Sequence, residues 1–294
     1  MKKINIYKDF ILFFTFPVIL IILYFINPSQ LFVTGNQTSF IAILISCVIF
    51  EFFIRKAKNG ENFYMRPIPA MQAMEEAVGR ATEMGSSVLF VPGISGLDEI
   101  DTISGVIILG HVAGMVAEYE ADLHVPCCVP IVMEAAKESC KEAYLKKGRP
   151  DLYNDSKIHY VTDDQFAYAA GVNGIMLREK PAAVFYQGKF YAESLLLAET
   201  GSSVGAIQIA GTGSSSQIPF FVTSCDYVLI GEEFYAASAY LSGSPEMIGS
   251  IKGQDYVKLL CMVLIGFVVL VSFFNFLNIT QLDISSFFKI NISN

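Results

Sequence analysis

The sequence predicts an α/β fold, namely a doubly wound, mostly parallel Rossmann-like sheet with helices on both faces, together with about three transmembrane helices. Two observations lead to this class. In the middle of the chain, short apolar segments alternate with longer segments rich in Ala and Gly, which favours a layered α/β sandwich. Near both ends, long uncharged apolar stretches raise the hydrophobic fraction to 53%. A partial barrel is the alternative arrangement of the same strands.

The predicted strands are mostly apolar and do not strictly alternate with polar residues. Segments such as VLFV and AIQI suit strands that are buried on both faces of a parallel sheet. The predicted strands are Ser87–Val91, Leu123–Pro126, Lys157–Val161, Ala182–Tyr186, Ala206–Ile209 and Tyr227–Ile230.

Helices are predicted before and between these strands. A polar, Pro-containing linker, Arg55–Pro69, precedes the first of them. The predicted helices are Ala70–Met84, Asp101–Glu120, Pro130–Lys147, Asp164–Met176, Tyr191–Thr200, Gln217–Ser224 and Glu232–Leu241. Small residues such as Gly110 and Ala237 are frequent in them, and glycine in a helix costs about 1 kcal/mol relative to alanine. Close packing of helix on sheet is the preferred explanation, and a subunit interface is the alternative.

Three apolar blocks are candidates for membrane spans: Phe10–Ile26, Ser39–Ile54 and Leu259–Leu277. A spanning helix needs about 20 apolar residues, so the second block is marginal, and two re-entrant N-terminal helices are the structural alternative. The first block also resembles a signal peptide, but no small-residue cleavage site follows it, which indicates an uncleaved anchor.

Lysine and arginine near the apolar blocks predict the orientation, because cytoplasmic loops carry an excess of these residues. The N-terminal tail and the stretch after the second block are basic, whereas the loop 27–38 has no Lys or Arg. We therefore expect a multi-pass protein of the cell membrane whose main domain is cytoplasmic. The expected divisions are an N-terminal membrane hairpin at residues 1–58, the α/β domain at 59–256, and a transmembrane helix with a short tail at 257–294.

Charge and cysteine spacing exclude several classes of partner and site. The net charge of −8 argues against nucleic acid, which needs a basic surface. The six cysteines contain no CxxC pair, so the sequence indicates neither a zinc site nor a disulfide framework. None of the three histidines is spaced as a metal pair along the sequence, and no metal site is predicted.

Polar residues follow the carboxyl ends of the predicted strands, where parallel sheets place their ligand crevice. The loop Gly211–Gln217 is the most suggestive, because glycines and hydroxyl groups can present donors to an anion. A turn with a serine helix cap is the simpler interpretation. The candidate ligand-binding residues are Gly93, Ser95, Asp163, Asp164, Gly211, Gly213, Ser214, Ser215 and Glu232.

Acidic residues at these strand ends could also converge on a hard cation such as Mg²⁺. They comprise Asp98, Asp163, Asp164, Glu232 and Glu233. Each lies at or before the start of a predicted helix, where the helix dipole and capping favour acids in any case. Neither a catalytic residue nor a cofactor is identified, and whether the chain is an enzyme stays open.

Several long blocks of this sequence look familiar, among them RPIPAMQAMEEAVGRATEMG, FVPGISGLDEIDTISG, YVTDDQFAYAAGVNGIM and ETGSSVGAIQIAGTGSSSQIPFF. Together they resemble an uncharacterised family of prokaryotic membrane-anchored proteins, a domain of unknown function, over roughly residues 64–275. The resemblance implies a membrane protein carrying this domain, and it transfers no activity and no catalytic residue.

The function expected from the sequence is non-catalytic. A membrane-anchored domain would bind a small anionic ligand, or would assemble with copies of itself as a scaffold on the lipid bilayer. The alternative is a membrane-bound enzyme that acts on a phosphorylated or nucleotide-like metabolite in the strand-end crevice.

Overall fold

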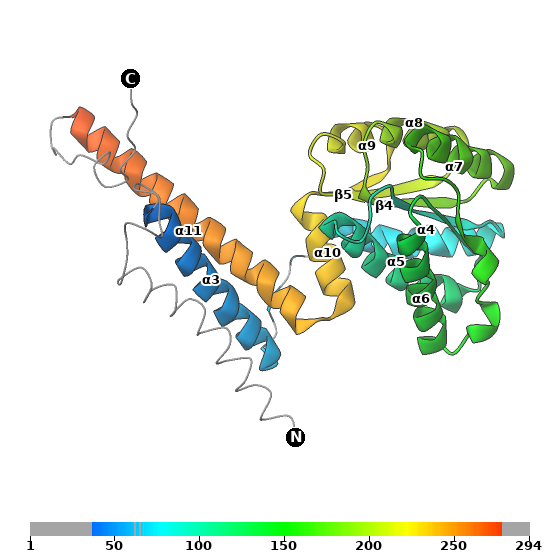
Figure 1. Ribbon diagram of the computed structural model, residues 1–294, viewed down its shortest axis with the longest axis horizontal. Coiled ribbons are helices and arrows are strands. Elements are labelled where there is room, and N and C mark those ends of the chain that lie inside the picture. Colours follow the sequence, from blue (N-terminus) through cyan, green and yellow to red (C-terminus); the bar gives the residue numbers. More distant parts are fainter. Residues whose placement is uncertain (1–36, 62, 65, 67, 278–294) are drawn as a thin grey trace. The chain divides into compact units, whose positions relative to one another are not determined.

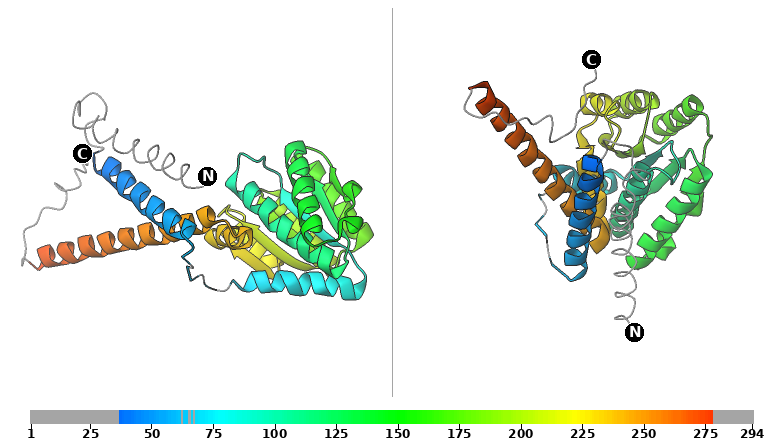
Figure 2. Two further views of the ribbon diagram at one scale, coloured as in Figure 1. Left: turned by 90° about the horizontal axis from the view of Figure 1, so that it is seen from below. Right: turned by 60° about the vertical axis from the view of Figure 1, so that its left-hand side comes forward.

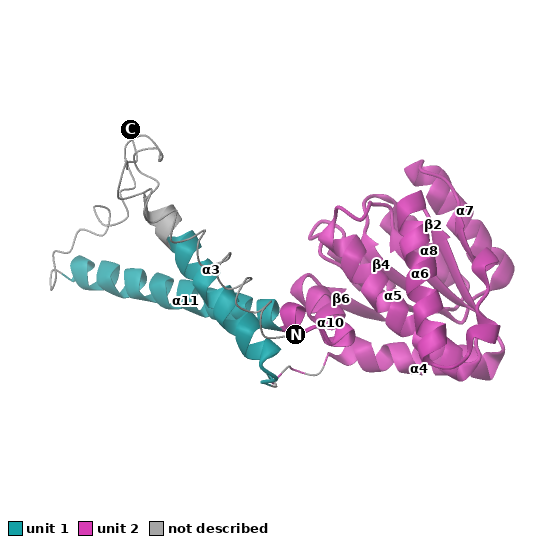
Figure 3. Cartoon of the chain, turned by 60° about the horizontal axis from the view of Figure 1, so that its bottom comes forward, with its two compact units in different colours: residues 1–63, 249–294 teal, residues 64–248 magenta. Residues whose placement is uncertain are grey.

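The computed structural model describes residues 37–61, 63, 64, 66 and 68–277. The chain divides into two compact units, one at residues 64–248 and the other at residues 1–63 with 249–294 (Figure 3). The first apolar block of the sequence, Phe10–Ile26, lies outside the described residues.

The unit 64–248 contains one sheet of six parallel strands in the order β3-β2-β1-β4-β5-β6. This is the strand order of the doubly wound Rossmann fold. The strands are β1 (Val88–Gly93), β2 (Leu123–Cys127), β3 (Ile158–Tyr160), β4 (Ala183–Lys189), β5 (Ile207–Thr212) and β6 (Tyr227–Ile230). The prediction of a parallel α/β sheet is therefore confirmed.

Helices cover both faces of the sheet (Figures 1 and 2). One face packs against α4 (Pro69–Met84), α5 (Ile100–Tyr119), α6 (Pro130–Lys146) and α10 (Glu232–Ser242). The other face packs against α7 (Gln165–Glu179), α8 (Glu193–Ser203) and α9 (Ile218–Ser224). Because successive side chains of a strand point to opposite faces, the central strands β1, β4 and β5 contribute to both cores. Phe185 lies in the first core and its neighbour Tyr186 in the second.

The predicted strands and helices correspond to the observed ones, with differences at their ends. Strand β4 runs three residues further than predicted, to Lys189, since Gln187 still pairs with Gly211 of β5 and Lys189 with Gly93 of β1. The predicted start of the linker Arg55–Pro69 was wrong. Helix α3 (Gln37–Lys58) continues through this basic segment, where positive side chains are favourable at a helix C-terminus.

Glycines allow α5 to lie very close to its neighbours. A Cβ added at Gly105 would be 2.4 Å from the backbone oxygen of Gln187 in β4, and one at Gly110 would be 2.6 Å from Ser139 Oγ of α6. In α10, Ala237 and Ala239 are completely buried within the unit. Close packing inside the domain thus accounts for these small residues of the predicted helices.

The second unit contains α3 and most of α11 (Pro245–Phe276), which pack together through two glycines of α11. A Cβ at Gly249 would be 2.5 Å from the Cα of Ile54, and one at Gly253 would be 3.1 Å from the Cα of Phe50. The two glycines form a G-x-x-x-G spacing, which permits close approach of two helices. This spacing is visible in the sequence, but it lies before the apolar block Leu259–Leu277 and was not part of the prediction.

Two helices of the described residues are long and apolar enough to cross a membrane, namely α5 and α11. Helix α5 is mostly buried in the α/β unit, whereas the apolar window of α11 has no buried part. The prediction of about three transmembrane helices is therefore corrected to two candidates. Only α11 corresponds to a predicted block, Leu259–Leu277; α3, which contains the block Ser39–Ile54, is not among the candidates. These two helices are weak evidence for membrane association.

Candidate functional site at the carboxyl edge of the sheet

The strand order identifies where a ligand crevice would lie in this fold. Chain connections leave β1 and β4 toward opposite faces of the sheet, and such a switch point opens a crevice beyond the strand ends. The residues that follow β1, β4 and β5 therefore form the candidate site.

Backbone contacts hold the ends of β1 and β4 together at this switch point. Gly93 has a φ of +82°, and a Cβ added there would be 2.5 Å from the backbone oxygen of Lys189. Gly188 has a φ of +148°, and a Cβ added there would be 2.3 Å from the backbone oxygen of Pro92. The backbone N–H of Ile94 then donates to the oxygen of Lys189 at 3.1 Å. The two loops thus remain paired beyond the strands.

An ion pair connects the same two loops. Lys189 Nζ lies 2.5 Å from Glu99 Oε1, just before α5, and 5.8 Å from the centre of the Tyr191 ring. The Glu99 carboxylate raises the pKa of Lys189. Both side chains are partly exposed, so the pair contributes little stability. The pair nevertheless means that Lys189, the lysine of this edge, already interacts with a carboxylate of the same chain.

The glycine-rich loop after β5 also forms hydrogen bonds with other residues of the α/β unit. Gly213 donates its backbone N–H to Asp101 Oδ2 at 3.2 Å, and the Tyr235 hydroxyl donates to Asp101 Oδ1. Ser214 donates its N–H to Thr212 Oγ1. Asp101 lies in the first turn of α5 and is buried. The carboxylate of Asp101 therefore accepts from the Gly213 N–H, a donor that a bound anion would otherwise use.

Two further groups complete this part of the site. Burial, together with the hydrogen bond to Asp101, raises the pKa of Tyr235. Gln187 of β4 is fully buried and donates to the oxygen of Ile209 at 3.0 Å. Within the described part of the chain its Oε1 has no hydrogen-bond partner, and it lies against Gly211. This acceptor is suited to one donor, such as a buried water.

A second group of polar residues lies beyond β2, β3 and β4. The carboxylate of Glu193 is fully buried, accepting from the backbone N–H of Tyr191 at 2.9 Å and from Gln165 Nε2 at 2.5 Å. Asp164 caps α7 by accepting from the N–H of Ala167 at 2.8 Å. Ser194 donates to Gln217 Oε1 at 2.8 Å. These groups fix the starts of α7 and α8.

Two buried cysteines at this edge are poor nucleophiles. Burial raises the pKa of Cys127 to about 12. Burial and the carboxylates of Glu193, Asp163 and Asp164 raise the pKa of Cys128 to about 11. Because the thiolate is the reactive form, both thiols stay protonated and unreactive at neutral pH.

The structure separates the predicted site residues into these two groups. The first group, around Asp101, includes Gly93, Ser95, Gly211, Gly213 and Ser214. The second group, around Cys128 and Glu193, includes Asp163 and Asp164. Ser215 is exposed, and Glu232 is in the first turn of α10. Whether any of them binds a ligand stays a prediction. The sequence did not single out Asp101, Glu193 or Tyr235 as site residues, although Asp101 is only three residues beyond Asp98.

Acids outnumber bases at this edge. The acids are Asp98, Glu99, Asp101, Asp163, Asp164, Glu193, Glu232 and Glu233, and the bases are Arg66 and Lys189. Arg66 lies 2.5 Å from Glu233. No group of three or more His, Cys, Asp or Glu side chains in the described residues is arranged to hold a metal ion. The surplus of negative charge disfavours a phosphorylated ligand here.

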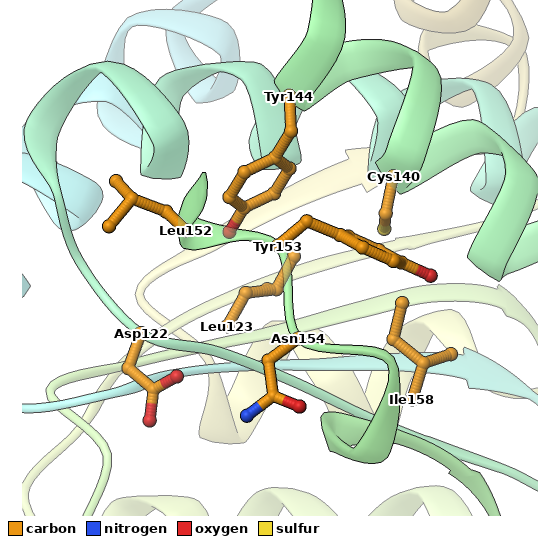
Figure 4. A pocket seen from close by; sticks show the side chains of 8 residues that line it. All are labelled: Asp122, Leu123, Cys140, Tyr144, Leu152, Tyr153, Asn154 and Ile158. Carbon is orange, nitrogen blue, oxygen red and sulfur yellow. The ribbon is translucent and has the colours of Figure 1, made fainter. Parts of the chain in front are cut away.

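Two hollows lie away from this edge. A cavity of about 10 Å³ lies between α6 and β2, beside Cys140, Tyr144 and Tyr153 (Figure 4), and it has room for about one water. A wider groove of about 380 Å³ lies on the outer side of α5, between α6 and the end of α10. Gly110 and Gly114 line this groove, and its two lysines, Lys146 and Lys147, pair with Glu142 and Glu118.

The strand order, the two helical layers and the glycine-mediated contact of β1 with β4 define a Rossmann-type α/β protein that also carries a long, exposed apolar helix. The family model described as "Domain of unknown function (DUF6754)" matches residues 27–283, so the chain belongs to this family. A comparison with curated proteins finds no match. The family resemblance in the sequence is thereby confirmed, while a prokaryotic origin is not part of that finding.

Proposed function

We propose that the chain is a non-catalytic scaffold, anchored in the cell membrane, whose α/β unit assembles with copies of itself. The observation that carries this proposal is the internal pairing of the carboxyl edge. Asp101 accepts from the glycine loop, Glu99 pairs with Lys189, and Glu193 accepts from Gln165 and Tyr191. Side chains at the edge where this fold usually binds a substrate instead form hydrogen bonds and an ion pair within the protein.

Membrane attachment is supported by α11. Most side chains in the apolar window of this helix are exposed, and an exposed apolar surface of that extent needs lipid or a protein partner. The basic residues Arg55, Lys56 and Lys58 at the end of α3 favour a multi-pass arrangement with the α/β unit in the cytoplasm.

Strand β6 and helix α9 form the surface that we propose for self-association. The strand β6 is at the edge of the sheet and has neither charge nor proline, two features that usually protect an edge strand. Four large apolar side chains on these elements, Phe220, Val222, Tyr227 and Ile230, are at least 39% exposed. An edge strand that pairs antiparallel with its own copy satisfies twofold symmetry.

Charge placed on this strand tests the proposal. In an antiparallel pair of β6 strands, Tyr227→Lys and Ile230→Lys place like charges close together, which destabilises the pair. Chemical crosslinking in membranes and sizing in mild detergent should show an oligomer for the wild type and mostly monomer for the double variant. Leu177→Lys, at an exposed apolar position of α7, is the matched control and should leave the oligomer intact.

A strictly monomeric wild type in both measurements would overturn the scaffold proposal. The enzyme alternative and the anion-binding alternative are tested on the same sample with a panel of nucleotides and sugar phosphates. A ligand at about 100 times its dissociation constant stabilises the fold by about 2.7 kcal/mol, which thermal unfolding detects. Such a shift would favour a metabolite site at the carboxyl edge over the scaffold.

A further inference from the structure

Three titratable side chains that are distant in the sequence meet at the outer part of the sheet. His124 of β2 and His159 of β3 lie with their ring centres 5.0 Å apart. His124 Nδ1 is 2.9 Å from Glu179 Oε2, at the last residue of α7, and His124 Nε2 is 3.4 Å from His159 Nδ1. None of these residues belongs to the carboxyl-edge site.

The fold explains why the sequence did not reveal this group. Strands β2 and β3 pair in parallel with Pro126 opposite His159. His124 precedes Pro126 by two residues and therefore points to the same face of the sheet. Neighbouring strands bring the two rings together, although 35 residues separate them along the chain.

The hydrogen bond to Glu179 determines which nitrogen of His124 has a free lone pair. A carboxylate only accepts, so Nδ1 of His124 carries the proton that faces Glu179. In the neutral ring, Nε2 is then unprotonated and directs its lone pair toward His159. A carboxylate that fixes the tautomer and orientation of an imidazole in this way is the usual partner of a metal-binding histidine.

The distance between the two facing nitrogens fits a shared metal ion. Two nitrogen ligands that each lie about 2.0–2.1 Å from a tetrahedral Zn²⁺ are roughly 3.3 Å apart. The observed 3.4 Å matches this separation and is longer than a usual hydrogen bond.

The surroundings favour a cation that solvent can reach. Glu179 and the C-terminal end of α7 supply negative charge. Asp122 and Lys157, which pair at 2.9 Å, balance each other nearby. His124 is buried and thereby fixed, whereas His159 and Glu179 are partly exposed.

We propose that His124 and His159 bind one divalent transition-metal ion of the Zn²⁺, Ni²⁺ or Cu²⁺ class, with Glu179 as the residue that orients His124. Imidazole ligands select this class of metal over Mg²⁺ and Ca²⁺. No third side chain of the described residues converges on the same point, so water completes the coordination. The site does not depend on the proposed scaffold function.

Calorimetric titration of the full-length protein in mild detergent, after treatment with EDTA, tests this site. Zn²⁺ should bind with one ion per chain, and Mg²⁺ should not bind. His159→Ala removes a partly exposed ligand and should weaken Zn²⁺ binding at least about tenfold, because only one protein ligand remains. Glu179→Gln keeps the shape but removes the charge that orients His124, and should weaken binding about 10–100-fold.

His111→Ala is the matched control, because His111 is the third histidine of the chain and lines the separate groove beside α5. This variant should bind Zn²⁺ as the wild type does. The absence of Zn²⁺ binding by the wild type would overturn the proposal. Binding that is unchanged in His159→Ala would also overturn it, and would place the ion on other groups such as the cysteines.

Discussion

At the scale of single residues, Asp101 connects three elements of the α/β unit. Its carboxylate accepts from the Gly213 N–H after β5 and from the Tyr235 hydroxyl of α10, and the residue itself belongs to α5. Hydrogen bonds to a charged group contribute about 1.5–3 kcal/mol each, and a buried donor left without its partner is costly. The stability of the carboxyl edge therefore depends strongly on this one side chain.

Asp101→Ala should lower the free energy of unfolding by about 3 kcal/mol, because it leaves two donors unpaired. Tyr235→Phe should cost less than Asp101→Ala, and should cost almost nothing in the Asp101→Ala background if the two side chains interact as described. Denaturant unfolding of the four proteins in mild detergent measures this cycle. Asp98→Ala, at an exposed acid three residues earlier, is the control, and a similar loss there would contradict the assignment.

Many contacts of single side chains could not be predicted from the sequence. The preference of acids for helix starts explains the position of Asp164, which caps α7. Local rules do not identify the long-range partners of a side chain, however. Asp101 and Tyr235 are 134 positions apart, and only the strand order brings them together. The histidine pair on β2 and β3 was missed for the same reason.

At the scale of elements, the sequence predicted six strands and seven helices at nearly their observed positions. Strand interiors are apolar and helix starts carry proline or acids, and both signals are local. The far end of β4 was missed because its last residues, Gln187 to Lys189, are polar or glycine. Gln187 pairs with Gly211 of β5, and Lys189 pairs with Gly93 of β1 because Gly93 and Gly188 let those two backbones approach closely.

Gly105→Ala should destabilise the protein by about 1–3 kcal/mol, because the new methyl group would overlap the backbone of β4, which cannot rotate away. Gly79→Ala in α4 is the matched control. A Cβ there has open space, so the substitution should stabilise the helix by about 0.5–1 kcal/mol. Thermal unfolding should shift in opposite directions for the two variants. A stabilising Gly105→Ala would show that α5 does not touch β4.

At the scale of the whole molecule, the orientation in the membrane remains a prediction. A reporter that is active only in the cytoplasm should work when it is inserted at Lys147–Gly148, directly after α6. It should fail when it is fused after Asn294 or inserted in the loop 27–38, because the loop has no Lys or Arg and the C-terminal tail has only Lys289, whereas the other positive residues near the apolar blocks lie on their opposite side. Activity after Asn294 would remove the crossing assigned to α11.

The strand order also has a consequence for synthesis on the ribosome. Strand β1 is made first but lies in the centre of the sheet, and its neighbour β4 follows about 90 residues later. At about 5–20 residues per second, the edge of β1 that pairs with β4 waits roughly 5–20 seconds for its partner, and β2 and β3 are made during this time. The nascent chain would need protection from aggregation during that interval.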